Sequence, residues 1–132
     1  MVLVDTNVLL DLVEDDPRWA PWSQEKLESV SAIDTLASNA IIYGELSIAF
    51  ERIEELDAVV ADAHLRMEPI PPEALFLAGK VFLQYRRRRG TKHSVLPDFY
   101  IGAHAAVMQW PLLTRDAKRY QTYFPTVEFI TP

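Results

Sequence analysis

The chain has 132 residues, of which 49% are hydrophobic and 24% charged, with no cysteine and a net charge of −6. This size and composition exclude a disordered or membrane-spanning chain and predict one domain over residues 1–132, because a chain this short can close one core but not two. The lack of cysteine excludes disulfides and thiolate metal sites, and three dispersed histidines (His64, His93 and His104) argue against a histidine cage, so any bound metal must have oxygen ligands.

The first residues predict a buried strand followed by a helix. Val2–Val4 form a short apolar run that ends at Asp5, and Thr6 and Asn7 then open a segment with the apolar spacing of a helix. The N-terminus has no pattern of a secretory signal, and no apolar run in the sequence reaches the ~20 residues that a membrane-spanning helix needs. We therefore expect a cytoplasmic protein.

The next segment predicts one strand and two helices. Residues 36–38 have the pattern of a second strand, and residues 41–50 and 51–63 have the patterns of two helices. Trp19 and Trp22 precede them in a proline-flanked segment that we expect to be a loop. They are candidates for stacking on bases, but packing in the core or in a dimer is the preferred interpretation.

The rest of the chain predicts two more helices and two more strands. Apolar spacing predicts a helix from Ala74 to Tyr85 that ends in Arg86–Arg89 with a cap at Gly90, and Asp98 opens a largely apolar helix over 99–108. Strands are expected at 112–114 and 127–130, with a helical turn at 116–120 between them. Strands that alternate with helices form a parallel α/β sheet covered on both faces, whose sites lie at the carboxyl ends of the strands.

Four carboxylates are candidates for such a site, although three of them have a simpler explanation. Asp5, Asp98 and Asp116 each stand before or at the start of a helical segment, where an aspartate commonly caps backbone N–H groups. Glu45 differs, because it lies on an apolar helix face and loses hydration there. Its neighbours three and four positions away are Ile41, Ile42, Ile48 and Ala49. A buried Arg or Lys partner would compensate for this loss, and so would a shared cation.

A divalent ion would allow the four carboxylates to share one site. Without a cation, converging carboxylates repel one another and some are forced to take up protons. Ligation by oxygen alone selects Mg²⁺ or Mn²⁺, which can polarise a phosphoryl oxygen and supply a hydroxide for in-line displacement. Thr114 is a candidate for orienting a carboxylate or the attacking water, and an ordinary strand threonine is the alternative. The sequence leaves open whether one ion or two bind.

Charge is distributed unevenly along the chain. Residues 1–85 carry a net charge of −11 and residues 86–132 a net charge of +5. The positive part contains the cluster Arg86–Arg89 and Lys92, and Arg115, Lys118 and Arg119 stand close to Asp116. Phosphate is the natural counter-charge for such a rim, and the alternative is a solvated helix end. His104 lies on an apolar helix and is interpreted as structural.

The motifs resemble those of PIN-domain ribonucleases, and among them the VapC-type toxins of type II toxin–antitoxin pairs. The resemblance covers nearly the whole chain. It rests on V-L-V-D-T-N-V-L-L at residues 2–10, the glutamate of Y-G-E-L at Glu45, L-P-D-F-Y-I-G-A-H-A at 96–105 and L-L-T-R-D at 112–116. The tail R-Y-Q-T-Y-F-P at 119–125 is also typical of one bacterial branch. D-T-N alone is a weak signal, but four acids in order, each in the right local setting, are a strong one.

The resemblance implies a three-layer α/β/α sandwich, a homodimer, cleavage of RNA, and inhibition by a small antitoxin that also binds DNA. It implies an acidic Mg²⁺ or Mn²⁺ pocket, with Asp5 and Asp98 as the foremost ligands. The catalytic and metal-binding set is expected to comprise Asp5, Glu45, Asp98, Asp116 and Thr114. Contacts to substrate are expected from Asn7, Arg86, Arg87, Arg89 and Arg115.

Three other classes compete with this interpretation. A phosphatase with an aspartyl nucleophile would need a second aspartate where Asn7 stands, and a phospho-receiver domain would need a lysine near the last strand instead of a fourth acid. The third is a catalytically silent module of the same fold that binds RNA or sequesters an antitoxin. The intact set of acids counts against it.

Overall fold

The computed structural model describes residues 1–92 and 95–132, so His93, one of the three histidines considered above, lies outside the described residues. A five-stranded sheet in the order β3-β2-β1-β4-β5 forms its centre, and every neighbouring pair is parallel. The strands are β1 (Val2–Val4), β2 (Leu36–Ser38), β3 (Arg66–Met67), β4 (Leu112–Leu113) and β5 (Phe129–Ile130). The predicted parallel α/β sheet is confirmed.

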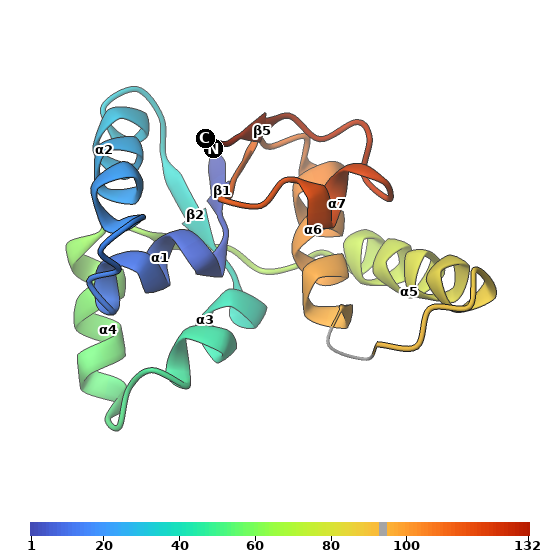
Figure 1. Cartoon of the computed structure of the whole chain (residues 1–132), viewed down its shortest axis with the longest axis horizontal. Helices are drawn as coiled ribbons and strands as arrows, with labels where there is room; N and C mark the ends of the chain where they lie inside the picture. Colours follow the sequence, from blue (N-terminus) through green and yellow to red (C-terminus); the bar gives the residue numbers. More distant parts are fainter. Residues whose placement is uncertain (93–94) are drawn as a thin grey trace.

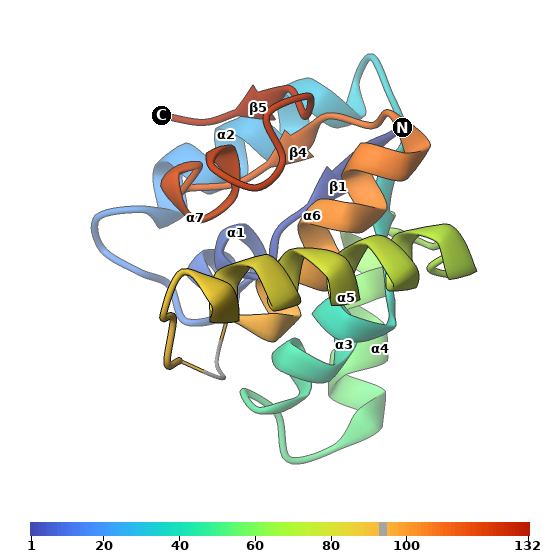
Figure 2. The same ribbon diagram turned by 90° about the vertical axis from the view of Figure 1, so that its right-hand side faces the viewer.

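Helices cover both faces of the sheet, which gives the expected three layers. Helices α1 and α2 pack together on one side, and α5 and α6 pack together on the other (Figure 1). The helices are α1 (Thr6–Val13), α2 (Ala20–Ser31), α3 (Ala40–Ser47), α4 (Ile53–Asp62), α5 (Pro72–Arg87), α6 (Leu96–Met108) and α7 (Lys118–Gln121). Figure 2, turned by 90°, shows α5 running across the front of α6.

The central strands are apolar because both of their faces are covered. Leu3 of β1 pairs with Ala37 of β2 and with Leu112 of β4, and all three side chains are fully buried. The pairing with β2 on one side and β4 on the other places β1 at the centre of the sheet. The residue that follows it, Asp5, therefore emerges at the middle of the carboxyl edge.

Two elements differ from the sequence-based expectation. The segment that contains Trp22 is helix α2 and not a loop, with a proline in its first turn, where no N–H is needed for a helical hydrogen bond. Strand β3 was not expected, because its two residues are both exposed at the edge of the sheet and carry no apolar pattern.

Helix α3 ends at Ser47 and not near Phe50, which changes the surroundings of Glu45. Ile48 is 88% exposed and Ala49 is also exposed. The apolar face that the sequence predicted around Glu45 is therefore present only on its N-terminal side, where Ile42 is fully buried. Glu45 itself is half-buried.

The end of α5 also differs in detail. The residue in the left-handed conformation is Arg89, with φ of 64°, and Gly90 has no positive φ. A Cβ at Gly90 would overlap the ring of Tyr85, so this glycine is needed for a close approach and not for its backbone angle. No helix within the described ranges is both long and apolar enough to cross a membrane.

Candidate active site

Asp5 lies at the carboxyl end of β1 and is 2% exposed. It caps α1, because its Oδ1 accepts a 2.7 Å hydrogen bond from the N–H of Thr6. Its Oδ2 accepts two more, at 2.8 Å each, from the hydroxyls of Thr114 and Tyr120. Burial raises the pKa of Asp5, and these three donors oppose that rise. Asp5 can therefore cap α1 and still belong to the candidate site.

Thr114 connects the first and fourth strands at this edge. Its Oγ1 donates to Asp5 and accepts hydrogen bonds from the side-chain amide of Asn7, at 3.3 Å, and from the N–H of Asp116, at 3.1 Å. Asn7 in turn accepts a 3.2 Å hydrogen bond from the N–H of Arg115. Thr114 is fully buried and uses its full donor and acceptor capacity, which sets it apart from an ordinary strand threonine.

Glu45 reaches the same edge from α3. Its Oε1 accepts a 2.7 Å hydrogen bond from the hydroxyl of Thr6, the residue next to Asp5. Burial raises the pKa of Glu45 and the negative charge of Asp5 raises it further, while Thr6 and Arg119 lower it. No ion pair of Glu45 with an Arg or Lys side chain occurs among the residues that the structure describes.

Asp98 and Asp116 share one arginine. Arg119 Nε lies 3.2 Å from Asp116 Oδ2, and its Nη1 lies 3.8 Å from Asp98 Oδ1. Asp98 stands inside the first turn of α6, whose N-cap is Val95, so the capping interpretation of Asp98 is wrong. Asp116 is not the N-cap of α7 either, because Ala117 holds that position.

The four acids lie close enough to influence one another. Burial raises the pKa of Asp98 to about 6; Arg119 pulls it down, and the charges of Asp5, Glu45 and Asp116 push it up. Within residues 1–92 and 95–132, however, no three acidic or histidine side chains stand close enough to surround a metal ion. The site thus gathers four carboxylates whose repulsion Arg119 relieves only in part, which suits a divalent cation, but their side chains are not arranged around one.

Two side chains at this edge were not predicted in their present roles. Tyr120 was expected only as the end of a helical turn, and Arg119 only as part of a basic rim near Asp116. Their positions three and four residues after Asp116 place them one helical turn away, facing back toward the acids. That spacing is the signal in the sequence that could have identified them.

The basic residues are divided between two places. Arg86, Arg87 and Arg89 are exposed at the end of α5. The guanidinium of Arg88 lies 5.8 Å from the ring centre of Tyr123, which connects this end of α5 to the segment after α7. Arg115 is directed elsewhere, because its Nε lies 2.8 Å from Asp11 Oδ2 and its guanidinium stacks on Trp19.

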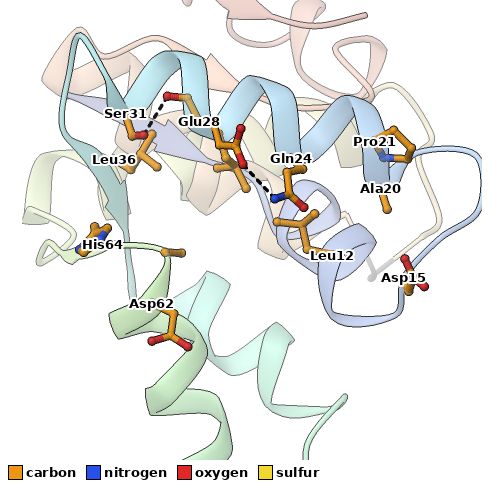
Figure 3. A pocket seen from close by; sticks show the side chains of 12 residues that line it. Leu12, Asp15, Ala20, Pro21, Gln24, Glu28, Ser31, Leu36, Asp62 and His64 are labelled. Carbon is orange, nitrogen blue, oxygen red and sulfur yellow. Dashed lines mark hydrogen bonds between the residues drawn. The ribbon is translucent and has the colours of Figure 1, made fainter.

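A cavity of about 480 Å³ lies between α1, α2 and the end of α4, and none of the four acids lines it. Figure 3 shows apolar side chains such as Leu12 and Leu36 together with the acidic Asp15, Glu28 and Asp62. His64 also lines it, and no Lys or Arg does. His104 is placed elsewhere again, fully buried, with its Nδ1 3.0 Å from Asn39 Nδ2.

Comparison with known proteins gives a family match and several structural neighbours. A family model described as "PIN domain" matches residues 2–125. A search among curated proteins gave no match.

The structural neighbours share the fold over almost the whole chain. VapBC2 from Rickettsia felis bound to a promoter DNA fragment has a TM-score of 0.75 at 17% identity, over 99% of this chain and 98% of that one. VapBC-1 from nontypeable Haemophilus influenzae has a TM-score of 0.72 at 20% identity, over 99% and 98%. A toxin–antitoxin complex from Klebsiella pneumoniae has a TM-score of 0.70 at 22% identity, over 96% and 95%.

Proposed function

Because the chain belongs to the PIN-domain family, we propose that it is a metal-dependent endoribonuclease and the toxin of a toxin–antitoxin pair. The observation that carries this proposal is the convergence of four carboxylates at the carboxyl edge of the sheet, where burial first, and then the charges of Asp5, Glu45 and Asp116, raise the pKa of Asp98 to about 6. A divalent cation stabilises such a site because it offsets the repulsion between the carboxylates.

The residues that would hold the cation are Asp5, Asp98, Glu45 and Asp116, and the ion would be Mg²⁺ or Mn²⁺. When bound, such an ion polarises a phosphoryl oxygen and lowers the pKa of a water that attacks the phosphorus. A carboxylate offers about four lone-pair positions, and Asp5 uses one on Oδ1 and two on Oδ2. One position on Oδ1 remains for a metal, so the donors around Asp5 select which oxygen would act as a ligand.

The residues around the acids would keep them in place during the reaction. Thr114 holds the side chain of Asp5 and the backbone of Asp116 through one hydroxyl. Asn7 connects this hydroxyl to the backbone of Arg115, which makes Asn7 a supporting residue, and one N–H and one lone pair of its amide remain for a contact with substrate. The exposed arginines at the end of α5 are proposed to bind RNA phosphates, and Arg115 is proposed to add to them with the guanidinium nitrogens that Asp11 leaves free.

The test is cleavage of a broad pool of transcripts by the purified, antitoxin-free protein. We expect cleavage with Mg²⁺ or Mn²⁺, none with EDTA, and none with Asp98→Asn. Glu25→Gln, an exposed acid on α2, is the matched control and should cut like the wild type. Cleavage that survives both EDTA and Asp98→Asn would sink the proposal.

A catalytically silent RNA-binding or antitoxin-sequestering module is the second candidate. The specific observation in its favour is that Arg119 contacts two of the acids while no three of the described acids surround a common point. The same experiment separates the two candidates. RNA binding by the wild type without any cleavage in either metal would favour the silent module.

The proposed partner is an antitoxin, as in the VapBC complexes with the same fold. The cavity beside α2 supplies a surface for it, with an apolar floor and three acidic side chains on its rim. A basic amphipathic segment complements that surface. We expect Asp15→Lys combined with Asp62→Lys to weaken the complex, while RNA cleavage by the free protein persists.

A homodimer is also proposed, and the outer face of α5 is a candidate surface for it. Leu75, Phe76 and Leu83 are 45%, 69% and 42% exposed on this helix. Phe76→Ser with Leu83→Ser should then shift the protein from dimer to monomer in light scattering. A wild type that is monomeric at all concentrations would exclude this assembly.

A further inference from the structure

We propose that Arg119 is a built-in counter-cation of the acidic pocket, which a divalent metal ion must displace from Asp98 and Asp116 in order to bind. The inference rests on the proposed metal site and adds a residue that regulates it. Arg119 would thus set the metal concentration at which the pocket fills.

The position of the guanidinium carries the first step. Its two nearest carboxylate oxygens belong to Asp116, at 3.2 Å, and Asp98, at 3.8 Å, so that the side chain bridges an acid of the loop between β4 and α7 and an acid of α6. Its positive charge also lowers the pKa of Asp5 and of Glu45. One arginine therefore interacts electrostatically with all four acids.

The backbone next to Arg119 carries the second step. Tyr120 is fully buried and donates to Asp5, which anchors the start of α7 against the acid at the centre of the pocket. This contact fixes the position of the backbone that carries Arg119. The guanidinium of an arginine stays charged in proteins, so Arg119 brings a permanent positive charge to this position.

The two ion pairs of Arg119 are weak enough for a metal ion to replace them. The Arg119 side chain is 49% exposed, and neither contact has the short bidentate geometry of a strong Arg–carboxylate pair. A partly exposed pair of this kind is displaced at small cost, so the penalty on metal affinity is about two- to fivefold. Arg119 can pair with the two acids in the metal-free protein, and a divalent ion can then replace it.

Lys118 provides an internal comparison. It is the neighbouring residue in the same short helix, it carries the same charge, and it is exposed. It makes no ion pair with an acid of the part of the chain that is described. A general effect of removing one positive charge should therefore be equal in Lys118→Gln and Arg119→Gln.

The experiment measures Mn²⁺ affinity by isothermal titration calorimetry in the full chain. Arg119→Gln should bind Mn²⁺ about two- to fivefold more tightly than Lys118→Gln. Arg119→Lys, which keeps the charge, should stay close to the wild type. Equal affinities of Arg119→Gln and Lys118→Gln, or weaker binding by Arg119→Gln, would overturn the inference.

A second measurement follows thermal unfolding. In EDTA, Arg119→Gln should melt below Lys118→Gln because the acids lose their counter-charge, and Mn²⁺ should raise its melting temperature by more. Equal melting temperatures of the two variants in EDTA would contradict the counter-cation role.

Asp98→Asn separates failure of this inference from failure of the proposed function. If Asp98→Asn leaves Mn²⁺ binding unchanged, the metal lies elsewhere and the proposed site is wrong. If Asp98→Asn abolishes binding but Arg119→Gln equals Lys118→Gln, only the role of Arg119 fails. If the wild type binds no Mn²⁺, binding that appears in Arg119→Gln supports the inference, and its absence there overturns it.

Discussion

The hydroxyl of Tyr120 donates a 2.8 Å hydrogen bond to Oδ2 of Asp5, across 115 positions of sequence. Both side chains are buried, and Thr114 donates to the same oxygen. The carboxylate at the end of the first strand is therefore oriented by two hydroxyls from the last quarter of the chain. With the N–H of Thr6 on Oδ1, one lone-pair position of this carboxylate has no hydrogen-bond partner among the described residues.

Tyr120→Phe should destabilise the fold, because a buried carboxylate loses one of its three donors. The expected loss in the free energy of unfolding is about 1.5–3 kcal/mol, typical of a hydrogen bond to a charged group. Urea unfolding near neutral pH measures it. Tyr123→Phe is the matched control, since Tyr123 is half-buried and its ring packs on Phe99. An equal effect of the two substitutions would deny the hydroxyl of Tyr120 this role.

The raised pKa of Asp98 predicts that the free energy of unfolding of the metal-free protein declines as the pH rises. Its pKa is about 6 in the folded protein against an ordinary value of 3.8, so the folded state holds a proton that the unfolded state has already lost. The resulting stability is fully present below about pH 4 and disappears as the pH rises through about 6. Urea unfolding in EDTA from pH 4 to 7 should show this decline, and Asp98→Asn should flatten it. A slope unchanged by Asp98→Asn would contradict the prediction.

The arginine cluster at the end of α5 predicts a salt-dependent contribution to RNA binding. Arg86→Ala combined with Arg87→Ala should weaken binding of the metal-free protein and reduce the slope of log K against log salt by about 1–2, through the loss of two phosphate contacts. Fluorescence anisotropy with labelled RNA from 50 to 300 mM KCl measures this slope. Arg52→Ala with Arg66→Ala removes two exposed arginines outside the cluster and serves as control. If both pairs give the same slope, the cluster is only a solvated helix end.

Two glycines in helices predict opposite effects of the same substitution. A Cβ at Gly102 of α6 would overlap the ring of Phe124, so Gly102→Ala should cost about 1–3 kcal/mol of unfolding free energy. Gly79 of α5 has open space around its Cβ position, so Gly79→Ala should stabilise by about 0.5–1 kcal/mol. Thermal and urea unfolding of the two variants test both signs. A stable Gly102→Ala protein would show that α6 and Phe124 are not packed as described.

Most of the architecture could be predicted from sequence because its central strands carry an unambiguous pattern. Val2–Val4, residues 36–37 and Leu112–Leu113 are short apolar runs, each followed by a polar residue, which is typical of strands covered on both faces. Strand β3 escaped prediction because its residues are exposed at an edge. Helix α2 escaped because Pro21 was interpreted as part of a loop, although a proline in a first helical turn is compatible with a helix.

The candidate site divides in the same way. Asp5, Glu45, Asp98 and Asp116 could be selected from local settings, and their shared role in binding metal stays a prediction. The apolar face around Glu45 was partly wrong, because α3 stops at Ser47 and Ile48 turns out to solvent. The Gly90 cap was also wrong, since Arg89 takes the left-handed conformation.

The sequence by itself determined most of the elements, the parallel sheet and the choice of the four acids as candidates, because each of these depends on a few neighbouring residues. Only the tertiary structure decided which groups hold the acids: the two hydroxyls on Asp5, the Thr6 hydroxyl on Glu45, and the arginine between Asp98 and Asp116. These contacts join residues from separate elements, and a hydrogen bond depends on distance and angle in space, which no local pattern encodes.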